Sequence, residues 1–120
     1  MSFVLQSRKK LRVENRLGLH IAPAAMIVKL LTQYPNVSVL VRNSDEQVDA
    51  RSVMGLIMLE ARKNSELLFM LEGGSLADHQ ELLRKLSDLF RSKFAEEWIL
   101  WVKISLEMVG ESFAFFCKTF

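Results

Sequence analysis

The spacing of hydrophobic and polar residues predicts seven elements between residues 10 and 93. Alternation of apolar and polar residues is typical of a half-buried strand, and apolar residues three or four apart are typical of an amphipathic helix. Strands are expected at 10–14, 37–41, 47–50 and 66–72, and helices at about 21–34, after Ser52 and at about 76–90. The continuous apolar run 67–71 is typical of a central strand. Helices packed on one face of a four-stranded antiparallel sheet make an open-faced β-sandwich of the α+β class, with three helices on that face.

Turn residues separate these elements. Gly18 lies in the loop before the first helix, Pro35 closes that helix, and the pair Gly73 and Gly74 precedes the last one. The polar stretch 43–46 is expected to join the second and third strands in a hairpin. His79 is expected on the polar, solvent-facing side of the last helix.

Residues 95–120 differ in character from the preceding domain, 1–94. Val102, Ile104, Leu106 and Met108 alternate with polar residues, which favours an added hairpin, although Trp98, Trp101 and Val109 also fit a helix. So much apolar surface in this C-terminal extension must pack on the domain or on another subunit. A structural role as an obligate oligomer is therefore one of three hypotheses.

Composition excludes several classes of function. Sixteen basic and fourteen acidic residues leave a net charge of +2, too balanced to favour nucleic acid as a ligand. Cys117 is the single cysteine, so no disulfide framework within the chain is possible and a reducing compartment is indicated. No Cys/His cluster has metal-ligand spacing, and we expect neither a metal nor another cofactor. No membrane span or secretory signal is predicted, which favours a cytoplasmic protein.

His20 is the first candidate for chemistry. It directly precedes a predicted helix start, and Pro23 suits the first helical turn because its missing N–H costs nothing there. The backbone N–H groups of Ile21 and Ala22, with the positive end of the helix dipole, would form an anion site beside the ring. This arrangement predicts a histidine that carries a phosphoryl group. The alternative is a tolerated surface histidine or a weak cap.

The short helix after Ser52 is the second candidate region. Ser52 is a suitable N-cap. If Val53, Met54 and Ile57 are exposed, they form an apolar patch suited to docking partners, in which methionine adapts to several surfaces. The alternative is that all three residues are buried in the core.

Residues 10–94 resemble the histidine-containing phosphocarrier (HPr) family of the bacterial phosphotransferase system, and its nitrogen-related branch most of all. Three segments carry the resemblance in the right order. The stretch 17–24, Leu-Gly-Leu-His-Ile-Ala-Pro-Ala, is similar to the family's active-site motif, and 49–55 is similar to its serine-site segment. The glycine-rich break before the last helix is similar to the family's C-terminal third.

The resemblance implies that His20 accepts a phosphoryl group from enzyme I and passes it to an enzyme IIA-type partner. It also implies that Ser52 is a regulatory site for a serine kinase, as in some members, although many members keep this serine only as a cap. The family's arginine two residues after the histidine is replaced by Ala22. Arg16 and Arg51 are candidates for a substitute cation. The alternative function is therefore an HPr-like regulatory binding module with weak or no phosphotransfer.

Overall fold

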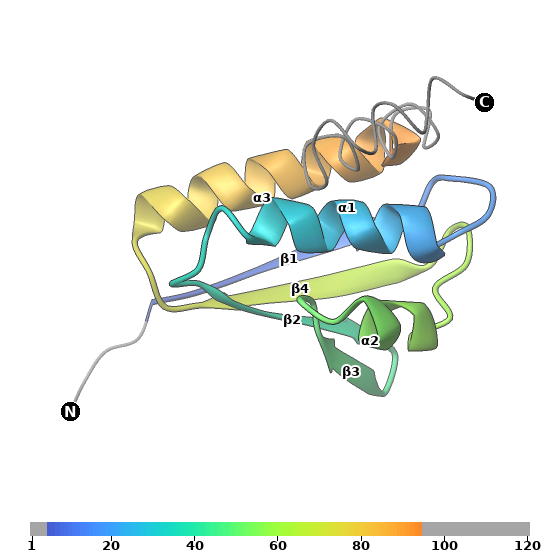
Figure 1. Cartoon of the computed structure of the whole chain (residues 1–120), viewed down its shortest axis with the longest axis horizontal. Helices are drawn as coiled ribbons and strands as arrows, with labels where there is room; N and C mark the ends of the chain where they lie inside the picture. Colours follow the sequence, from blue (N-terminus) through green and yellow to red (C-terminus); the bar gives the residue numbers. More distant parts are fainter. Residues whose placement is uncertain (1–4, 95–120) are drawn as a thin grey trace, which may run out of the picture.

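The computed structural model describes residues 5–94, which form one antiparallel sheet covered by helices (Figure 1). The elements along the chain are β1 (Gln6–Arg12), α1 (Ile21–Leu31), β2 (Ser38–Asn43), β3 (Glu46–Asp49), α2 (Val53–Met58), β4 (Glu66–Glu72) and α3 (Leu76–Arg91). This order and the open-faced α+β architecture are as predicted. The expectations for the extension 95–120 lie outside the described residues.

The sheet has the strand order β1-β4-β2-β3, and every neighbouring pair is antiparallel. The strand β4 therefore lies in the interior of the sheet, as its continuous apolar run predicts. The predicted hairpin is confirmed, because Asn43 pairs with Glu46 and leaves a two-residue loop. Ser44 in that loop has a left-handed φ of 56°, a conformation that glycine or asparagine adopts more easily.

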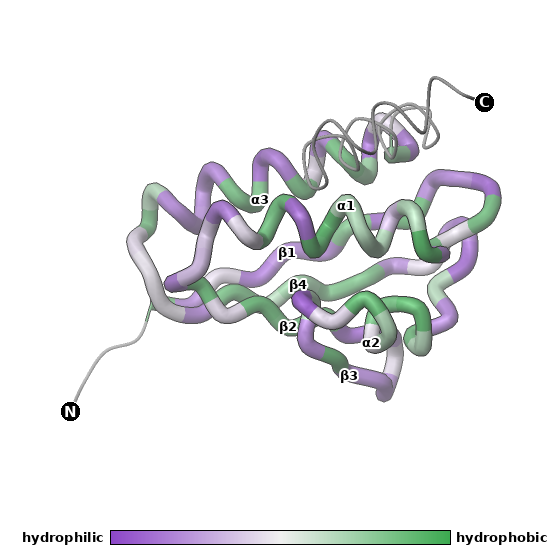
Figure 2. The backbone as a smooth tube through the Cα atoms, viewed as in Figure 1, coloured by the Kyte–Doolittle hydropathy of each residue, from purple (hydrophilic) through white to green (hydrophobic). Residues whose placement is uncertain are grey.

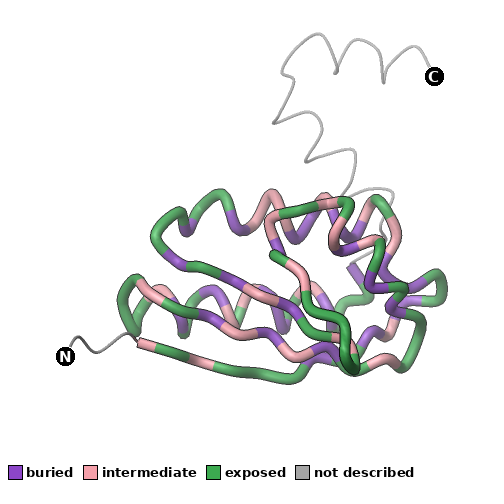
Figure 3. Tube along the Cα trace, turned by 90° about the horizontal axis from the view of Figure 1, so that it is seen from below, coloured by how far each residue is buried: buried purple, intermediate pink, exposed green. Residues whose placement is uncertain are grey.

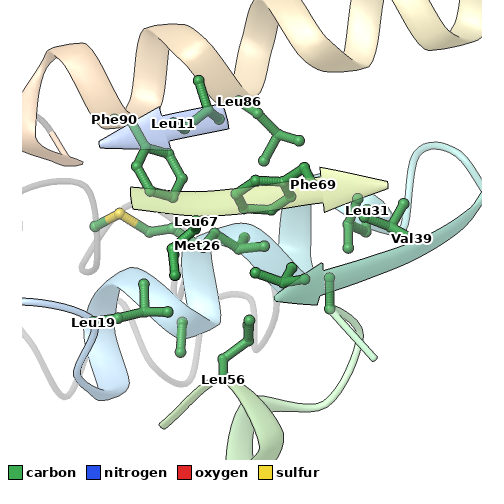
Figure 4. Packing of buried hydrophobic residues seen from close by; sticks show 14 of the residues in the cluster. Leu11, Leu19, Met26, Leu31, Val39, Leu56, Leu67, Phe69, Leu86 and Phe90 are labelled. Atoms are coloured by element: carbon green, nitrogen blue, oxygen red, sulfur yellow. The ribbon is translucent and has the colours of Figure 1, made fainter. Parts of the chain in front are cut away.

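The core lies between the sheet and the helices. Leu67, Phe69 and Leu71 on β4 are buried and the residues between them are half-buried, so the two kinds of position alternate along the strand, as they do elsewhere in the sheet (Figure 3). Phe69 meets Phe90 of α3 edge to face, with ring centroids 5.5 Å apart (Figure 4). Such aromatic pairs add about 0.5–1.5 kcal/mol to the burial of the rings.

Helix α3 shows the amphipathic pattern expected of a helix on a sheet, with alternating hydrophilic and hydrophobic segments along its length (Figure 2). It begins with a capping box in which the Ser75 hydroxyl accepts from the Asp78 N–H and the Asp78 carboxylate accepts from the Ser75 N–H. This box satisfies two backbone donors at the helix start.

Several boundaries differ from the sequence prediction. Strand β1 ends at Arg12 and not at residue 14, β2 spans Ser38–Asn43 and not 37–41, and β3 spans Glu46–Asp49 and not 47–50. Strand β1 begins at Gln6 and not at Lys10, because Arg8, Lys9 and Lys10 are exposed on a strand at the edge of the sheet and show no apolar alternation. Helix α1 ends at Leu31, three residues before the expected Tyr34. Helix α2 has six residues, fewer than the two turns expected.

The prediction that His79 lies on the surface is wrong. Its side chain is 1% exposed, in the first turn of α3. The Nε2–H donates to the Gly73 carbonyl, and the Ser7 hydroxyl donates to Nδ1 over 2.7 Å. Because a carbonyl can only accept, these two bonds fix the tautomer with the proton on Nε2. The ring thus joins β1 and the β4–α3 turn to α3.

Residues 5–94 contain no helix that is long and apolar enough to cross a membrane. The same residues bring together no group of three metal-ligating side chains.

Candidate functional site

His20 is the N-cap residue of α1. Its backbone is extended, with φ −98° and ψ −166°, and its side chain makes no capping hydrogen bond. Its carbonyl accepts the first helical hydrogen bond, from the Ala24 N–H over 3.0 Å. The ring is half-buried at the helix start. The predicted position of His20 immediately before the helix is confirmed.

The first turn of α1 offers two backbone donors beside His20. The N–H groups of Ile21 and Ala22 are the first two of an α-helix and have no acceptor within it. Pro23 has no N–H, and the next N–H, of Ala24, already bonds to His20. The helix is 11 residues long, so its dipole places roughly half a positive charge at this end. The site can therefore bind a small anion next to an imidazole.

The loop that precedes His20 is held against the segment after α2. The Leu19 N–H donates to the Ala61 carbonyl over 2.9 Å, and the Asn15 side-chain amide donates to the Gly18 carbonyl over 2.6 Å. Gly18 has a φ of +72°, and a Cβ at this position would lie 2.4 Å from the Ala61 oxygen. Only glycine fits this close approach without a shift of the backbone. These contacts hold the loop, and with it the backbone of His20, in place.

Arg51 is not a substitute cation at this site. Its guanidinium donates to the carbonyls of Leu31, Tyr34 and Val37 at 2.6–2.8 Å, all near the C-terminal end of α1. At 1.5 Å per residue, that end is about 16 Å from His20 along the helix. Arg51 therefore bonds to the last carbonyl of α1 and to two carbonyls of the segment that follows it, and it does not face the anion site. Arg16, the other candidate, is exposed in the loop before His20.

Ser52 caps α2 as predicted. Its hydroxyl accepts from the Gly55 N–H over 2.9 Å, and its backbone is extended. The residue is exposed, so a modifying enzyme could reach it. The structure thus confirms the cap and leaves the regulatory role of Ser52 as a prediction.

The predicted apolar patch on α2 is correct in part. Met54 is 66% exposed, whereas Val53 and Ile57 are partly buried and pack on the core. Sequence reasoning missed Met58, which is 69% exposed and lies one turn after Met54. The spacing of four residues between the two methionines was the signal available in the sequence.

Two further exposed apolar residues flank His20 in the chain. Leu17 is 71% exposed in the preceding loop, and Ile21 is 60% exposed at the first position of α1. Helix α1 packs beside α2, so its start and the two methionines belong to neighbouring helices (Figure 1). We call Leu17, Ile21, Met54 and Met58 the exposed apolar set. Large apolar side chains left in water next to a reactive group are typical of a surface that meets another protein.

Several known proteins are similar to this chain. A family model described as "PTS HPr component phosphorylation site" matches residues 7–92. The phosphocarrier protein HPr of Treponema pallidum is 38% identical over 89 residues, which cover 74% of this chain and 97% of that protein. HPr of Chlamydia trachomatis is 34% identical over 84 residues, or 70% of this chain and 73% of that one.

Solved structures agree with the sequence comparisons. The crystal structure of HPr-C-His from Thermoanaerobacter tengcongensis is similar, with a TM-score of 0.63 and 28% identity. The match covers 74% of this chain and 96% of that one. An HPr structure from Bacillus anthracis gives the same TM-score at 25% identity, covering 71% and 96% of the two chains.

Proposed function

The chain belongs to the HPr family of phosphocarrier proteins, and on this premise we propose that it accepts a phosphoryl group on His20 and passes it to a second protein. The donor is enzyme I and the acceptor is an enzyme IIA-type protein of the phosphotransferase system, in the cytoplasm. The protein acts as a carrier and not as a turnover enzyme. The observation that carries the proposal is the position of His20 at the start of α1, beside the N–H groups of Ile21 and Ala22.

The transfer needs one nucleophile and a place for the phosphoryl oxygens. A neutral ring nitrogen of His20 attacks the phosphorus, and a nitrogen–phosphorus bond forms while the bond to the donor atom breaks. The donor atom keeps the electron pair of that bond, and the ring releases its N–H proton. Imidazole is available in its neutral form near pH 7, which suits this step. The N–H groups of Ile21 and Ala22 stabilise the phosphoryl oxygens without having to move.

The exposed apolar set supplies the docking surface for both partners. Met54 and Met58 present flexible, polarisable side chains on α2, and Ile21 adjoins His20. A partner that covers these residues excludes water from the ring and brings its own phosphoryl group into line. Ser52 at the start of α2 lies two residues before Met54, so a phosphate added there by a serine kinase would place charge next to this surface.

The direct test is phosphorylation of the purified full chain by phosphoenolpyruvate and a bacterial enzyme I. We expect an acid-labile, base-stable label, the signature of a phosphohistidine, and its loss in His20→Ala. The second histidine serves as an internal control, because His79 is 1% exposed and both of its ring nitrogens are engaged. A label that persists in His20→Ala contradicts the proposal.

One observation favours a second candidate function, a regulatory binding module that transfers phosphate weakly. Ala22 provides no positive charge in the first turn of α1, and Arg51 is committed to the other end of that helix. In this case, binding to the partner survives His20→Ala and fails in Met54→Asp, as measured by titration calorimetry. Equal loss of binding in both variants counts against the module.

A further inference from the structure

The loop after α2 brings a cation to the segment that holds His20. A Cβ built on Gly18 would lie 3.1 Å from the Cα of Arg62, so the two backbones are in contact. The Gly18 carbonyl in turn accepts from the His20 N–H over 3.1 Å. Figure 1 shows the loop before α1 and the loop after α2 at the same end of the molecule. Arg62 and His20 are thus separated in sequence but close in the fold.

A phosphoryl group on His20 needs more positive charge than the helix start provides. A phosphate monoester carries a charge of about −1.5 to −2 near neutral pH, and a phosphohistidine is of similar charge. The helix dipole contributes roughly half a positive charge, and the two N–H groups are neutral donors. Ala22 adds no charge. A guanidinium near the ring would balance the remainder and would bind two phosphoryl oxygens at once.

Arg62 is suited to this role because its backbone is held in place and its side chain is long. Its backbone is fixed, because its N–H donates to the Ser65 hydroxyl over 3.0 Å and its carbonyl accepts from the Ser65 N–H over 2.9 Å. Its side chain is exposed and forms no ion pair with any residue from 5 to 94. Six covalent bonds of about 1.5 Å join its Cα to the guanidinium nitrogens, a length comparable to the span of at most about 7 Å between the Cα atoms of Gly18 and His20.

We propose that Arg62 is a phosphate-binding residue that stabilises the phosphoryl group on His20. This inference rests on the proposed function. It differs from the sequence expectation, in which Arg16 and Arg51 are the candidate cations. Arg51 bonds to carbonyls near the C-terminal end of α1, and Arg16 is exposed on the loop before His20, so both alternatives to Arg62 are included in the test or excluded by their contacts. The adjacent Lys63 is exposed on the same loop and provides a matched control.

The test is the initial rate of phosphorylation by phosphoenolpyruvate and enzyme I in five proteins: wild type, Arg62→Gln, Arg62→Lys, Lys63→Gln and Arg16→Gln. We expect Arg62→Gln to slow phosphorylation by about 100- to 1,000-fold, the effect of removing one donor that binds developing charge. Lys63→Gln and Arg16→Gln are expected to stay within about twofold of wild type, as for ordinary surface changes. Arg62→Lys should recover part of the rate, because it restores the charge but not the two-pronged geometry.

A rescue experiment separates the loss of a positive charge at the phosphoryl group from a change in the fold. Ala22→Arg placed in the Arg62→Gln protein should restore most of the rate, since it returns a guanidinium to the first turn of α1. If Arg62→Gln unfolds in urea with the same midpoint as wild type, its fold and stability are unchanged. If Arg62→Gln is phosphorylated as fast as Lys63→Gln while wild type is labelled on His20, the assignment of Arg62 is wrong and the proposed function stands. If wild type takes no label, both are wrong.

Discussion

Replacing Arg51 by alanine should destabilise the domain and leave the chemistry at His20 intact. Three backbone carbonyls, of Leu31, Tyr34 and Val37, accept from this one guanidinium at 2.6–2.8 Å. A hydrogen bond from a charged donor contributes about 1.5–3 kcal/mol. The three bonds share one cation and the site is only partly buried, so water replaces part of what is lost and the bonds are not additive. We therefore expect a loss of about 2–4 kcal/mol in the free energy of unfolding.

Urea denaturation followed by circular dichroism measures this loss. The slope of the transition should be unchanged, and the midpoint should fall by about 1 M or more, because small domains lose about 1–3 kcal/mol per molar urea. Arg51→Lys is the matched control and should lose less, since lysine keeps the charge but cannot reach three carbonyls at once.

The same variants separate the structural role of Arg51 from a role in catalysis. At a temperature where Arg51→Ala remains folded, its phosphorylation rate should stay within about threefold of wild type, a difference below 1 kcal/mol. An unfolding free energy within 0.5 kcal/mol of wild type, or a phosphorylation rate reduced far more than stability explains, would refute the assignment of Arg51 to the end of α1.

Three other changes test the packing around the site. Gly18→Ala should lower the free energy of unfolding by at least about 2 kcal/mol, because the left-handed backbone alone costs about 1–2 kcal/mol and the new Cβ meets the Ala61 oxygen. A melting temperature equal to that of wild type would contradict this close approach. Ser52→Ala should lower the free energy of unfolding in urea by about 1 kcal/mol, whereas Ser52→Asp keeps both the cap and the stability. Equal losses in the two variants would argue against capping. His79→Leu should lose about 2–3 kcal/mol by calorimetry because the Ser7 hydroxyl and a backbone carbonyl lose their partner, and an unchanged stability would show that this ring is dispensable.

The sequence predicts those elements whose pattern is strong and local. The run 66–72 and the helix beginning at Leu76 have the expected bounds, because an uninterrupted apolar strand and a capped amphipathic helix each carry their signal within a few residues. The start of α1 at Ile21 is also where His20 and Pro23 predict it. The residues at the ends of these elements are therefore enough to predict where each element begins.

Long-range contacts account for what sequence reasoning missed. His79 is buried because Ser7, 72 residues earlier, lies opposite its ring, and no local pattern signals that pairing. The guanidinium of Arg51 turns to carbonyls 14 to 20 residues away, so its charge suggested a site that its contacts rule out. The nearness of Arg62 to Gly18 likewise depends on how α2 and its following loop return to the start of α1.

The lengthwise arrangement of the domain has a practical consequence for measurement. Strand β1 begins at the end of the sheet opposite the start of α1 and runs its seven residues between the two ends (Figure 1). At about 3.3 Å per residue the strand alone spans about 23 Å. A sensor chip or bead coupled at the start of β1 would therefore hold His20 and the exposed apolar set away from the support. Immobilisation at that end should leave the capture of a phosphoryl donor from solution unhindered.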